Sequence, residues 1–192
     1  MAELVTNPEA MAKAQEELDQ QVGRERLMTE MDIEELPYLQ AISKEVLRLH
    51  PSAPMDDPHL NEKPSSLGGY YIPANSIVLH NLWALGQDDS IWDNPTVFNP
   101  DRFLRTDECR SMNVYGSNFQ LLPFSSGRRR CPAYQFATLT LQHVVGVLLH
   151  AFDWSMYPKG ILDMEESDGI VVGLKHPLKL SVTARMSLLN AT

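Results

Sequence analysis

One stretch of the chain decides how its fold is interpreted: Pro123-Phe124-Ser125-Ser126-Gly127-Arg128-Arg129-Arg130-Cys131-Pro132-Ala133. It predicts a site for a metal-bound thiolate at Cys131. A cysteine binds a metal as the thiolate, which nearby cations and the free N–H groups of a helix start favour. Three arginines precede Cys131, and Pro132 stands where a helix would have its first residue. Gly127 permits the tight turn that aims backbone N–H groups at the sulfur.

The spacing of these residues is more specific than any one of them. An isolated cysteine is usually a small core hydrophobe, and three arginines are usually a solvated patch. Phe-x-x-Gly-x-Arg-x-Cys directly before a long apolar segment resembles the haem-ligand loop of the cytochrome P-450 family. The resemblance implies that Cys131 is the axial thiolate on haem iron and that Arg129 holds a haem propionate. It also implies that Phe124 packs beside the sulfur and that Gly127 supplies N–H groups that tune the potential of the iron. Ala133 stands where the family usually has the glycine that lies closest to the porphyrin.

Composition narrows the class of protein. With 192 residues the chain is long enough for one sizeable core, and its net charge of −9 argues against a nucleic-acid partner. Two cysteines exclude a disulfide framework and leave Cys109 as a free thiol without a role. The sequence shows no basic-then-apolar N-terminal signal and no run of about 18 apolar residues. These features predict a soluble, intracellular chain.

Capping and periodicity signals predict helices in several segments. Asn7 before Pro8 is typical of a helix start, with the Asn side chain as the cap, and Gly23 is typical of a helix end. The mainly apolar segment 134–151 predicts a helix buried on most sides, with His143 as a core histidine rather than a second metal ligand. The expected helices cover residues 7–22, 38–50, 81–86 and 134–151, with a helical turn at 32–36, a loop at 88–100 and a mobile polar stretch at 105–118.

Glu45 lies in the apolar stripe of the helix expected at 38–50. A buried carboxylate is costly unless it is paired, and Arg48 is within reach three residues later. An ordinary surface ion pair, which contributes little, is the alternative explanation. Glu-x-x-Arg resembles the second signature of the P-450 family, and the resemblance implies that Arg102 completes the set from a Pro-x-Arg-Phe segment. Glu45, Arg48 and Arg102 would then lock the loop carrying Cys131 onto the helix, a structural role.

The segments that predict strands are shorter than those that predict helices. Runs at 69–72 and 76–80 around the turn residues 73–75 predict a hairpin. Alternation from Leu178 to Met186 predicts a half-buried strand, and we expect 170–172 to pair with it.

The resemblance also assigns a substrate cavity. It implies that Met55, Asp56 and Asp57 face or flank substrate and that His59 binds a haem propionate. The turn Ser167-Asp168-Gly169 resembles the last substrate-contacting loop of the family.

The fold implied by the resemblance is mainly α with small β-sheets (α+β), the C-terminal haem-binding part of the cytochrome P-450 fold. We expect residues 1–192 to form one partial domain, the haem-ligand half, without the distal oxygen-binding helix and the N-terminal anchor. Full-length relatives are expected at the cytosolic face of the endoplasmic reticulum membrane. The chain without an anchor would be soluble or aggregated.

The activity implied is that of a haem- and iron-binding monooxygenase that inserts one oxygen atom into a small organic substrate. Leu47-Arg48-Leu49-His50-Pro51 resembles the plant microsomal branch, which implies a plant secondary metabolite as substrate. Haem, as iron protoporphyrin IX, would be the cofactor, and NADPH would act through a flavoprotein reductase that contacts Arg128 and Arg130. We expect this chain alone not to turn over. The alternatives are a non-catalytic truncated haem-binding fragment and a soluble interaction domain without haem.

Overall fold

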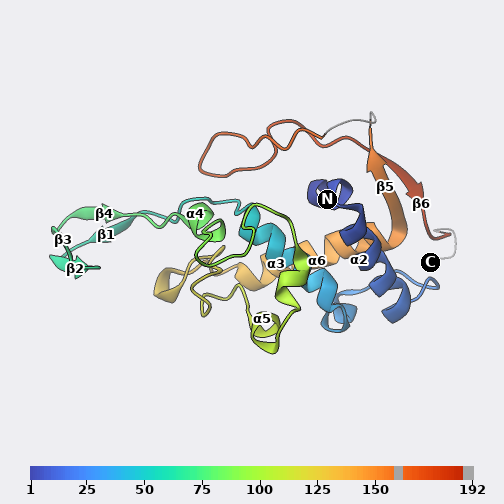
Figure 1. Cartoon of the computed structure of the whole chain (residues 1–192), viewed down its shortest axis with the longest axis horizontal. Coiled ribbons are helices and arrows are strands. Elements are labelled where there is room, and N and C mark those ends of the chain that lie inside the picture. Colours follow the sequence, from blue (N-terminus) through green and yellow to red (C-terminus); the bar gives the residue numbers. More distant parts are fainter. Residues whose placement is uncertain (158–161, 188–192) are drawn as a thin grey trace.

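The computed structural model describes residues 1–157 and 162–187. Its helices form one body, from which strands β1 to β4 extend as an arm (Figure 1). The helical elements are α1 (Ala2–Thr6), α2 (Pro8–Gln21), η1 (Glu30–Glu35), α3 (Pro37–Leu49), α4 (Leu82–Gly86), η2 (Pro100–Phe103), α5 (Asp107–Ser111), η3 (Gly127–Arg129) and α6 (Tyr134–Ala151). The strands are β1 (His59–Asn61), β2 (Ser65–Leu67), β3 (Tyr70–Ile72), β4 (Ser76–Val78), β5 (Phe152–Met156) and β6 (Leu180–Ala184).

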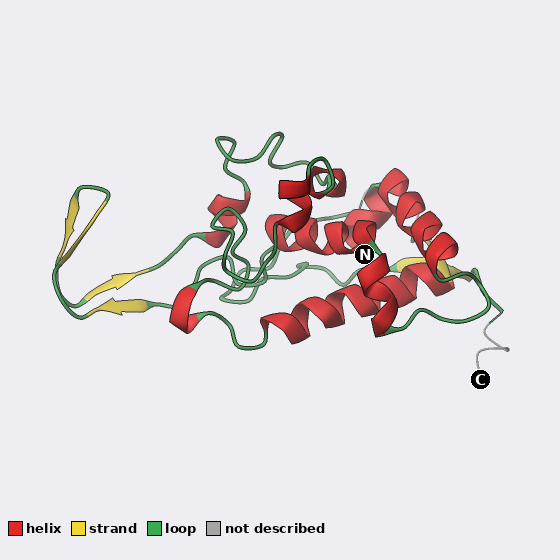
Figure 2. Ribbon diagram, turned by 90° about the horizontal axis from the view of Figure 1, so that it is seen from below, coloured by secondary structure: helices red, strands yellow, loops and turns green. Residues whose placement is uncertain are grey.

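The main core lies where α2, α3 and α6 pack against one another. Its most buried side chains include Leu4, Ala14, Leu18, Leu36, Leu39, Ile42 and Leu149. Burying each leucine or isoleucine stabilises the fold by roughly 1.5–3 kcal/mol before entropy is counted. In Figure 2, helix α6 lies along the lower edge of the group of helices. The core therefore fixes the helix that follows Cys131.

Helix α2 begins and ends close to the predicted residues, but its cap differs from the prediction. The side chain of Asn7 does not cap α2; its Nδ2 donates to the carbonyl oxygen of Glu3 at 2.8 Å. The reason is that α1 ends directly before Asn7 and its free carbonyls compete for the amide. Gly23 ends the helix as expected, with φ +80° and its N–H donating to the Leu18 oxygen at 3.3 Å.

Helix α6 has the predicted bounds, but its burial is narrower than expected. One face is buried, whereas Phe136 and Val144 on the other side are 72% and 50% exposed. His143 is only half-buried, so its prediction as a core histidine was wrong. The buried histidine is His150, which accepts from the N–H of Met28 at 3.2 Å through Nδ1 and donates to the Gly23 oxygen at 2.7 Å through Nε2.

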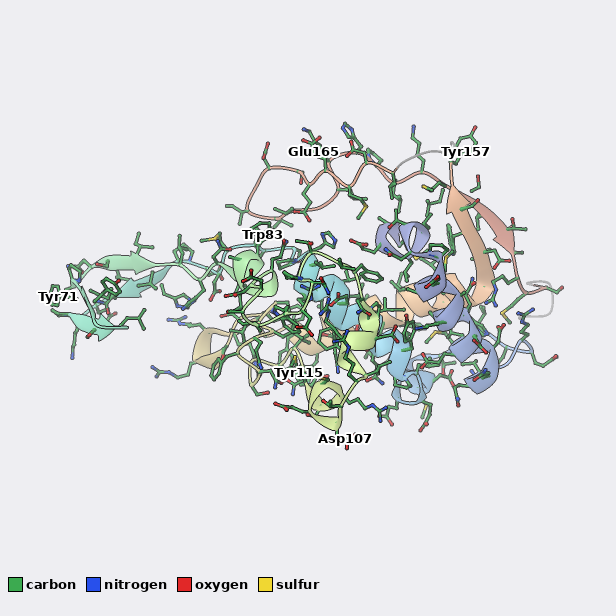
Figure 3. The ribbon with its side chains drawn as sticks, viewed as in Figure 1. Tyr71, Trp83, Asp107, Tyr115, Tyr157 and Glu165 are labelled. Atoms are coloured by element: carbon green, nitrogen blue, oxygen red, sulfur yellow. The ribbon has the colours of Figure 1, made fainter. Side chains whose placement is uncertain are left out.

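Strands β3, β4 and β6 lie within predicted runs, but β1, β2 and β5 were not predicted, 170–172 forms no strand, and the predicted pairing was wrong. The runs β3 and β4 do not pair with each other: β3 pairs with β2, and β4 pairs with β1, both antiparallel. The chain thus makes a nested double hairpin, with Tyr71 at its far end (Figure 3). Among the described residues, β6 pairs with β5 rather than with 170–172, where the N–H of Val172 donates to the Ser52 oxygen at 2.8 Å.

The polar stretch 105–118 contains the short helix α5. Thr106 caps this helix by accepting from the N–H of Cys109 at 3.1 Å. Across the residues that the structure describes, we find no helix with the length and apolar character needed to cross a bilayer.

His50, at the end of α3, joins three segments of the chain. Its Nε2 donates to Glu3 of α1 and its Nδ1 donates to Glu166, both at 2.7 Å. Because both ring nitrogens face carboxylates, both bonds require the imidazolium form. The hydrogen bond to Glu3, together with that to Glu166 and against the effect of burial, raises the pKa of His50 above its ordinary value of 6.5.

We therefore expect the contribution of His50 to stability to decrease with rising pH. A raised folded pKa means that this stabilisation is fully present below about pH 6.5 and is lost as pH rises through the folded pKa. The difference in free energy of unfolding between the wild type and His50→Asn, measured with urea, should be larger at pH 6 than at pH 9. Glu166→Gln, which removes one of the two carboxylate charges beside His50, should reduce this pH dependence, and an unchanged difference across the pH range would contradict the assignment.

Candidate functional site

A cavity of about 740 Å³ lies between the Cys131 loop and the segment that follows α3. Phe124, Arg129 and Cys131 come from the loop, and most of the other lining residues are apolar. Volumes of roughly 300–1,000 Å³ with a few polar groups are typical of sites for small ligands and cofactors. The cavity therefore has the size and lining of a ligand or cofactor site, and several of the predicted site residues line it.

Cys131 is half-buried at the edge of this cavity, and its N–H donates to the Phe124 oxygen at 3.0 Å. Gly127 opens the short helix η3 with φ +72°, and a Cβ there would meet nothing within 4 Å. Glycine is thus required for the backbone conformation and not for space. Pro132 is not the first residue of α6 as predicted, because Ala133 has φ −92° and ψ 11° and the helix begins only at Tyr134. The side chain of Ala133 is exposed.

The three arginines before Cys131 have different surroundings. Arg129 is exposed and lines the cavity, and Arg128 is exposed outside it. Arg130 stacks on the Tyr134 ring, with its guanidinium carbon 4.1 Å from the ring centre, and donates to the Tyr115 oxygen. Arg130 therefore connects the Cys131 loop to Tyr115 and to the start of α6, a role that the sequence pattern did not predict.

Glu45 is fully buried and accepts hydrogen bonds from both predicted arginines. Arg48 donates to its two oxygens at 2.8 Å each, and Arg102 Nε donates at 3.0 and 3.1 Å. The N–H of Asn99 donates to Glu45 as well, at 2.8 Å. Arg48 and Arg102 are 1% and 6% exposed, and both guanidinium groups lie over the ring of Trp92. The alternative of a surface ion pair is thereby excluded.

The remaining donors of this triad reach residues 86–97. Arg48 donates to the backbone oxygens of Gly86 and Pro95, and Arg102 donates to that of Asp93. The connection to the Cys131 loop runs instead through apolar packing of Phe103, Leu121 and Phe124. The triad thus organises the segment between α4 and η2, which in turn supports the loop.

Met55, Asp56 and Asp57 line the cavity, and their predicted position beside substrate stays a prediction. Asp56 accepts from Ser125 Oγ at 2.7 Å and from His80 Nδ1 at 3.0 Å. Although burial raises the pKa of Asp56, these hydrogen bonds bring it below its ordinary value. Sequence reasoning missed Ser125 and His80 as its partners. The available signal was the pair of aspartates in a segment otherwise expected to be apolar.

Two further expectations concern the edge of the cavity. Gly169 and Ile170 line it, so the turn that resembles a substrate-contacting loop does reach this site. His59 does not line it; its Nε2 lies 3.4 Å from Asp56 Oδ2. The predicted contact of His59 with a haem propionate stays a prediction.

The sequence and the structure of this chain are both similar to those of known proteins. The family model described as "Cytochrome P450" matches residues 1–183. Flavonoid 3',5'-hydroxylase CYP75B138 of Crocosmia x crocosmiiflora is 41% identical over 97% of this chain and 36% of its own length. Cytochrome P450 98A1 of Sorghum bicolor is 43% identical, with 97% of this chain and 36% of the relative covered. A structure of a zebra fish cytochrome P450 with Abiraterone superimposes with a TM-score of 0.82 and 33% identity, covering 95% of this chain and 41% of that one.

The chain belongs to the cytochrome P450 family, whose members are monooxygenases. The predicted α+β fold with small sheets is confirmed. The chain spans somewhat over a third of the length of these curated relatives, at 36%.

Proposed function

We propose that this chain carries the haem-thiolate site of a monooxygenase, with Cys131 as the axial ligand of iron protoporphyrin IX. The observation that carries the proposal is that Cys131, Arg129 and Phe124 all line the 740 Å³ cavity. A thiolate is a known axial ligand of haem iron, a guanidinium pairs with a propionate, and an aromatic ring shields the sulfur from water. The residues present therefore fit the group.

In this proposal each of five cavity-lining residues has its own role in binding haem or substrate. Cys131 supplies the thiolate, and Arg129 pairs with a propionate at the cavity edge. Phe124 excludes water from the sulfur, and Met55 and Ile170 offer apolar surface to a substrate. The bound haem supplies the chemistry that inserts one atom of molecular oxygen into a C–H bond.

The proposal extends to a substrate class and an electron donor. A small plant metabolite of the flavonoid or phenolic class is the proposed substrate, because several similar proteins are named flavonoid hydroxylases. NADPH would supply electrons through a flavoprotein reductase, for which the exposed Arg128 offers a positive contact. Arg130 offers less, since it is engaged with Tyr115 and Tyr134.

The proposal is tested by reconstituting the purified chain with haem, reducing it and adding carbon monoxide. We expect the red-shifted Soret band of thiolate ligation, since the ligand is Cys131. Cys131→Ser should lose this band completely, and Cys109→Ser, which changes the thiol of α5, should keep it. A nitrogen-type band in the wild type, or a thiolate band that survives in Cys131→Ser, would refute the assignment. Adding a flavonoid to the ferric form should shift the Soret band if the substrate class is right.

A further inference from the structure

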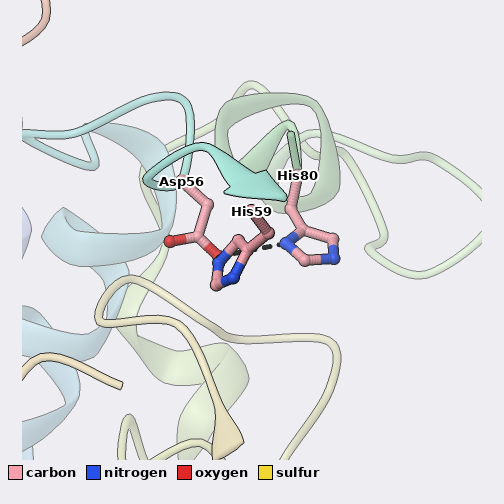
Figure 4. Close-up of side chains that lie close together, drawn as sticks. All are labelled: Asp56, His59 and His80. Carbon is pink, nitrogen blue, oxygen red and sulfur yellow. Dashed lines mark hydrogen bonds and ion pairs between the residues drawn. The ribbon is translucent and has the colours of Figure 1, made fainter. Parts of the chain in front are cut away.

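Three potential metal ligands meet at the rim of the cavity: Asp56, His59 and His80 (Figure 4). Asp56 Oδ2, His59 Nε2 and His80 Nδ1 all lie within 4.8 Å of one another. Asp56 is largely buried, with 9% of its side chain exposed, whereas His80 is 61% exposed. The three side chains lie close together, Asp56 and His59 from one stretch of the chain and His80 from another (Figure 4).

The backbone holds these three residues in place. In the antiparallel pair of β1 and β4, His59 lies opposite Val78, so His80 follows two residues further on the same face. The ladder continues beyond the strands, because the N–H of Asp56 donates to the His80 oxygen at 2.9 Å and Met55 bridges to Asn81. The cluster is therefore built on paired strands and does not depend on chance contacts of long side chains.

The spacing of the donor atoms matches that of a tetrahedral metal site. With metal–ligand bonds of about 2.0–2.1 Å, neighbouring ligand atoms lie roughly 3.3–3.4 Å apart. Asp56 Oδ2 lies 3.0 Å from His80 Nδ1 and 3.4 Å from His59 Nε2. His59 Nε2 and His80 Nδ1 lie within 4.8 Å of each other, so the exposed His80 ring would turn toward the ion on binding.

Asp56 Oδ2 is the shared neighbour of three polar groups. Its Oδ2 faces Ser125 Oγ at 2.7 Å as well as the two imidazole nitrogens, whereas one carboxylate oxygen offers about two lone pairs. His80 hydrogen-bonds to Oδ2 at 3.0 Å, whereas His59 Nε2 approaches the same oxygen only to 3.4 Å. A cation between the three ligand atoms would instead accept one lone pair from each imidazole and one from the carboxylate.

Asp56 further has the outer contacts that orient a metal ligand. The Ser125 hydroxyl donates to Oδ2, and the N–H of Asp57 donates to Oδ1 at 2.8 Å. Such contacts fix the direction of a ligating carboxylate and strengthen metal binding.

We propose that Asp56, His59 and His80 bind a divalent transition-metal ion of the zinc, nickel or copper type, with water in the remaining position. Two imidazoles and one carboxylate suit these ions better than they suit calcium or magnesium, which prefer oxygen ligands. Through Ser125 the ion would link the base of the strand arm to the loop that carries Cys131. This site requires no haem, and the ion would compete for His59 with the haem propionate that the resemblance assigns to this side chain.

A second cluster in the described part of the chain provides a matched control. Asp163, Glu165 and His176 also lie within 4.8 Å of one another, but all three are exposed. Glu165 already pairs with Lys175 at 2.5 Å, and only one imidazole is present. This cluster is therefore expected to bind metal weakly.

The test is a calorimetric titration of the purified, haem-free chain with Zn²⁺. We expect one saturable site whose Kd rises at least about 100-fold in His80→Ala, since losing even an outer contact costs roughly 10–100-fold. His80 is exposed, so this variant should keep its fold, which circular dichroism checks. Asp56→Asn should weaken binding to a similar degree, and His176→Ala should leave it unchanged.

Three results would overturn the proposal. The first is a wild-type chain without a saturable Zn²⁺ site, and the second is a His80→Ala variant that binds as tightly as the wild type. The third is a thiolate-to-cobalt charge-transfer band after loading with Co²⁺, which would place the metal on a cysteine instead. Because no haem is present in any of these measurements, they fail or succeed separately from the carbon monoxide test.

Discussion

Replacing Glu45 by alanine is expected to lower the free energy of unfolding by about 3–5 kcal/mol, because it leaves two buried guanidinium groups without their counter-charge. Arg48 and Arg102 are almost fully buried, and together they direct four hydrogen bonds at the Glu45 carboxylate. Domains of this size have total stabilities of only about 5–15 kcal/mol. The variant should therefore unfold at a much lower urea concentration than the wild type, and part of it should be unfolded even at room temperature without urea.

Urea denaturation followed by circular dichroism measures this change. Asp101→Ala is the matched control, because it breaks the exposed ion pair of Asp101 with Lys13 at 2.7 Å and removes a carboxylate of similar size. Exposed pairs contribute about 0–1 kcal/mol, so the control should differ little from the wild type. Glu45→Gln separates charge from packing, because it keeps the side-chain volume. It should show most of the loss of stability expected for Glu45→Ala. Equal midpoints for Glu45→Ala and Asp101→Ala would show that the triad does not support the fold.

The features that the sequence predicted correctly are those set by neighbours along the chain. Glu45 and Arg48 are three residues apart on one helix, so their pairing follows from the helical repeat. Gly23 ends α2 through its own positive φ. The Phe124 to Cys131 spacing likewise places its members on one loop, and the structure brings three of them to one cavity.

The features that sequence reasoning missed depend on residues far apart. The strands β1 and β2 are only three residues long, and Ser65 and Ser66 give no apolar alternation that would reveal them. Without these partners, β3 and β4 seemed to pair with each other. The partners of Asp56 are 24 and 69 residues away, at His80 and Ser125. No local pattern connects such positions, so the proposed metal cluster became visible only in three dimensions.

Gly86→Ala is expected to destabilise the fold by about 3 kcal/mol, at the upper end of the usual 1–3 kcal/mol for overpacking. A Cβ at Gly86 would lie 2.2 Å from the backbone oxygen of Arg48. Because that atom belongs to the backbone of α3, no side-chain rotation relieves the clash, and either α3 or α4 must move. The movement would also disturb the hydrogen bond from Arg48 Nη1 to the Gly86 oxygen.

Gly173→Ala is the control for Gly86→Ala, because a Cβ at Gly173 would meet nothing within 4 Å. Its midpoint in urea should stay close to that of the wild type. Since Gly86 and Glu45 both act on Arg48, the double variant of Gly86→Ala and Glu45→Gln should lose less stability than the sum of the two single losses. Strict additivity would mean that the close approach of α4 to α3 and the burial of the ion triad are independent, which the shared contacts of Arg48 with Glu45 and Gly86 argue against.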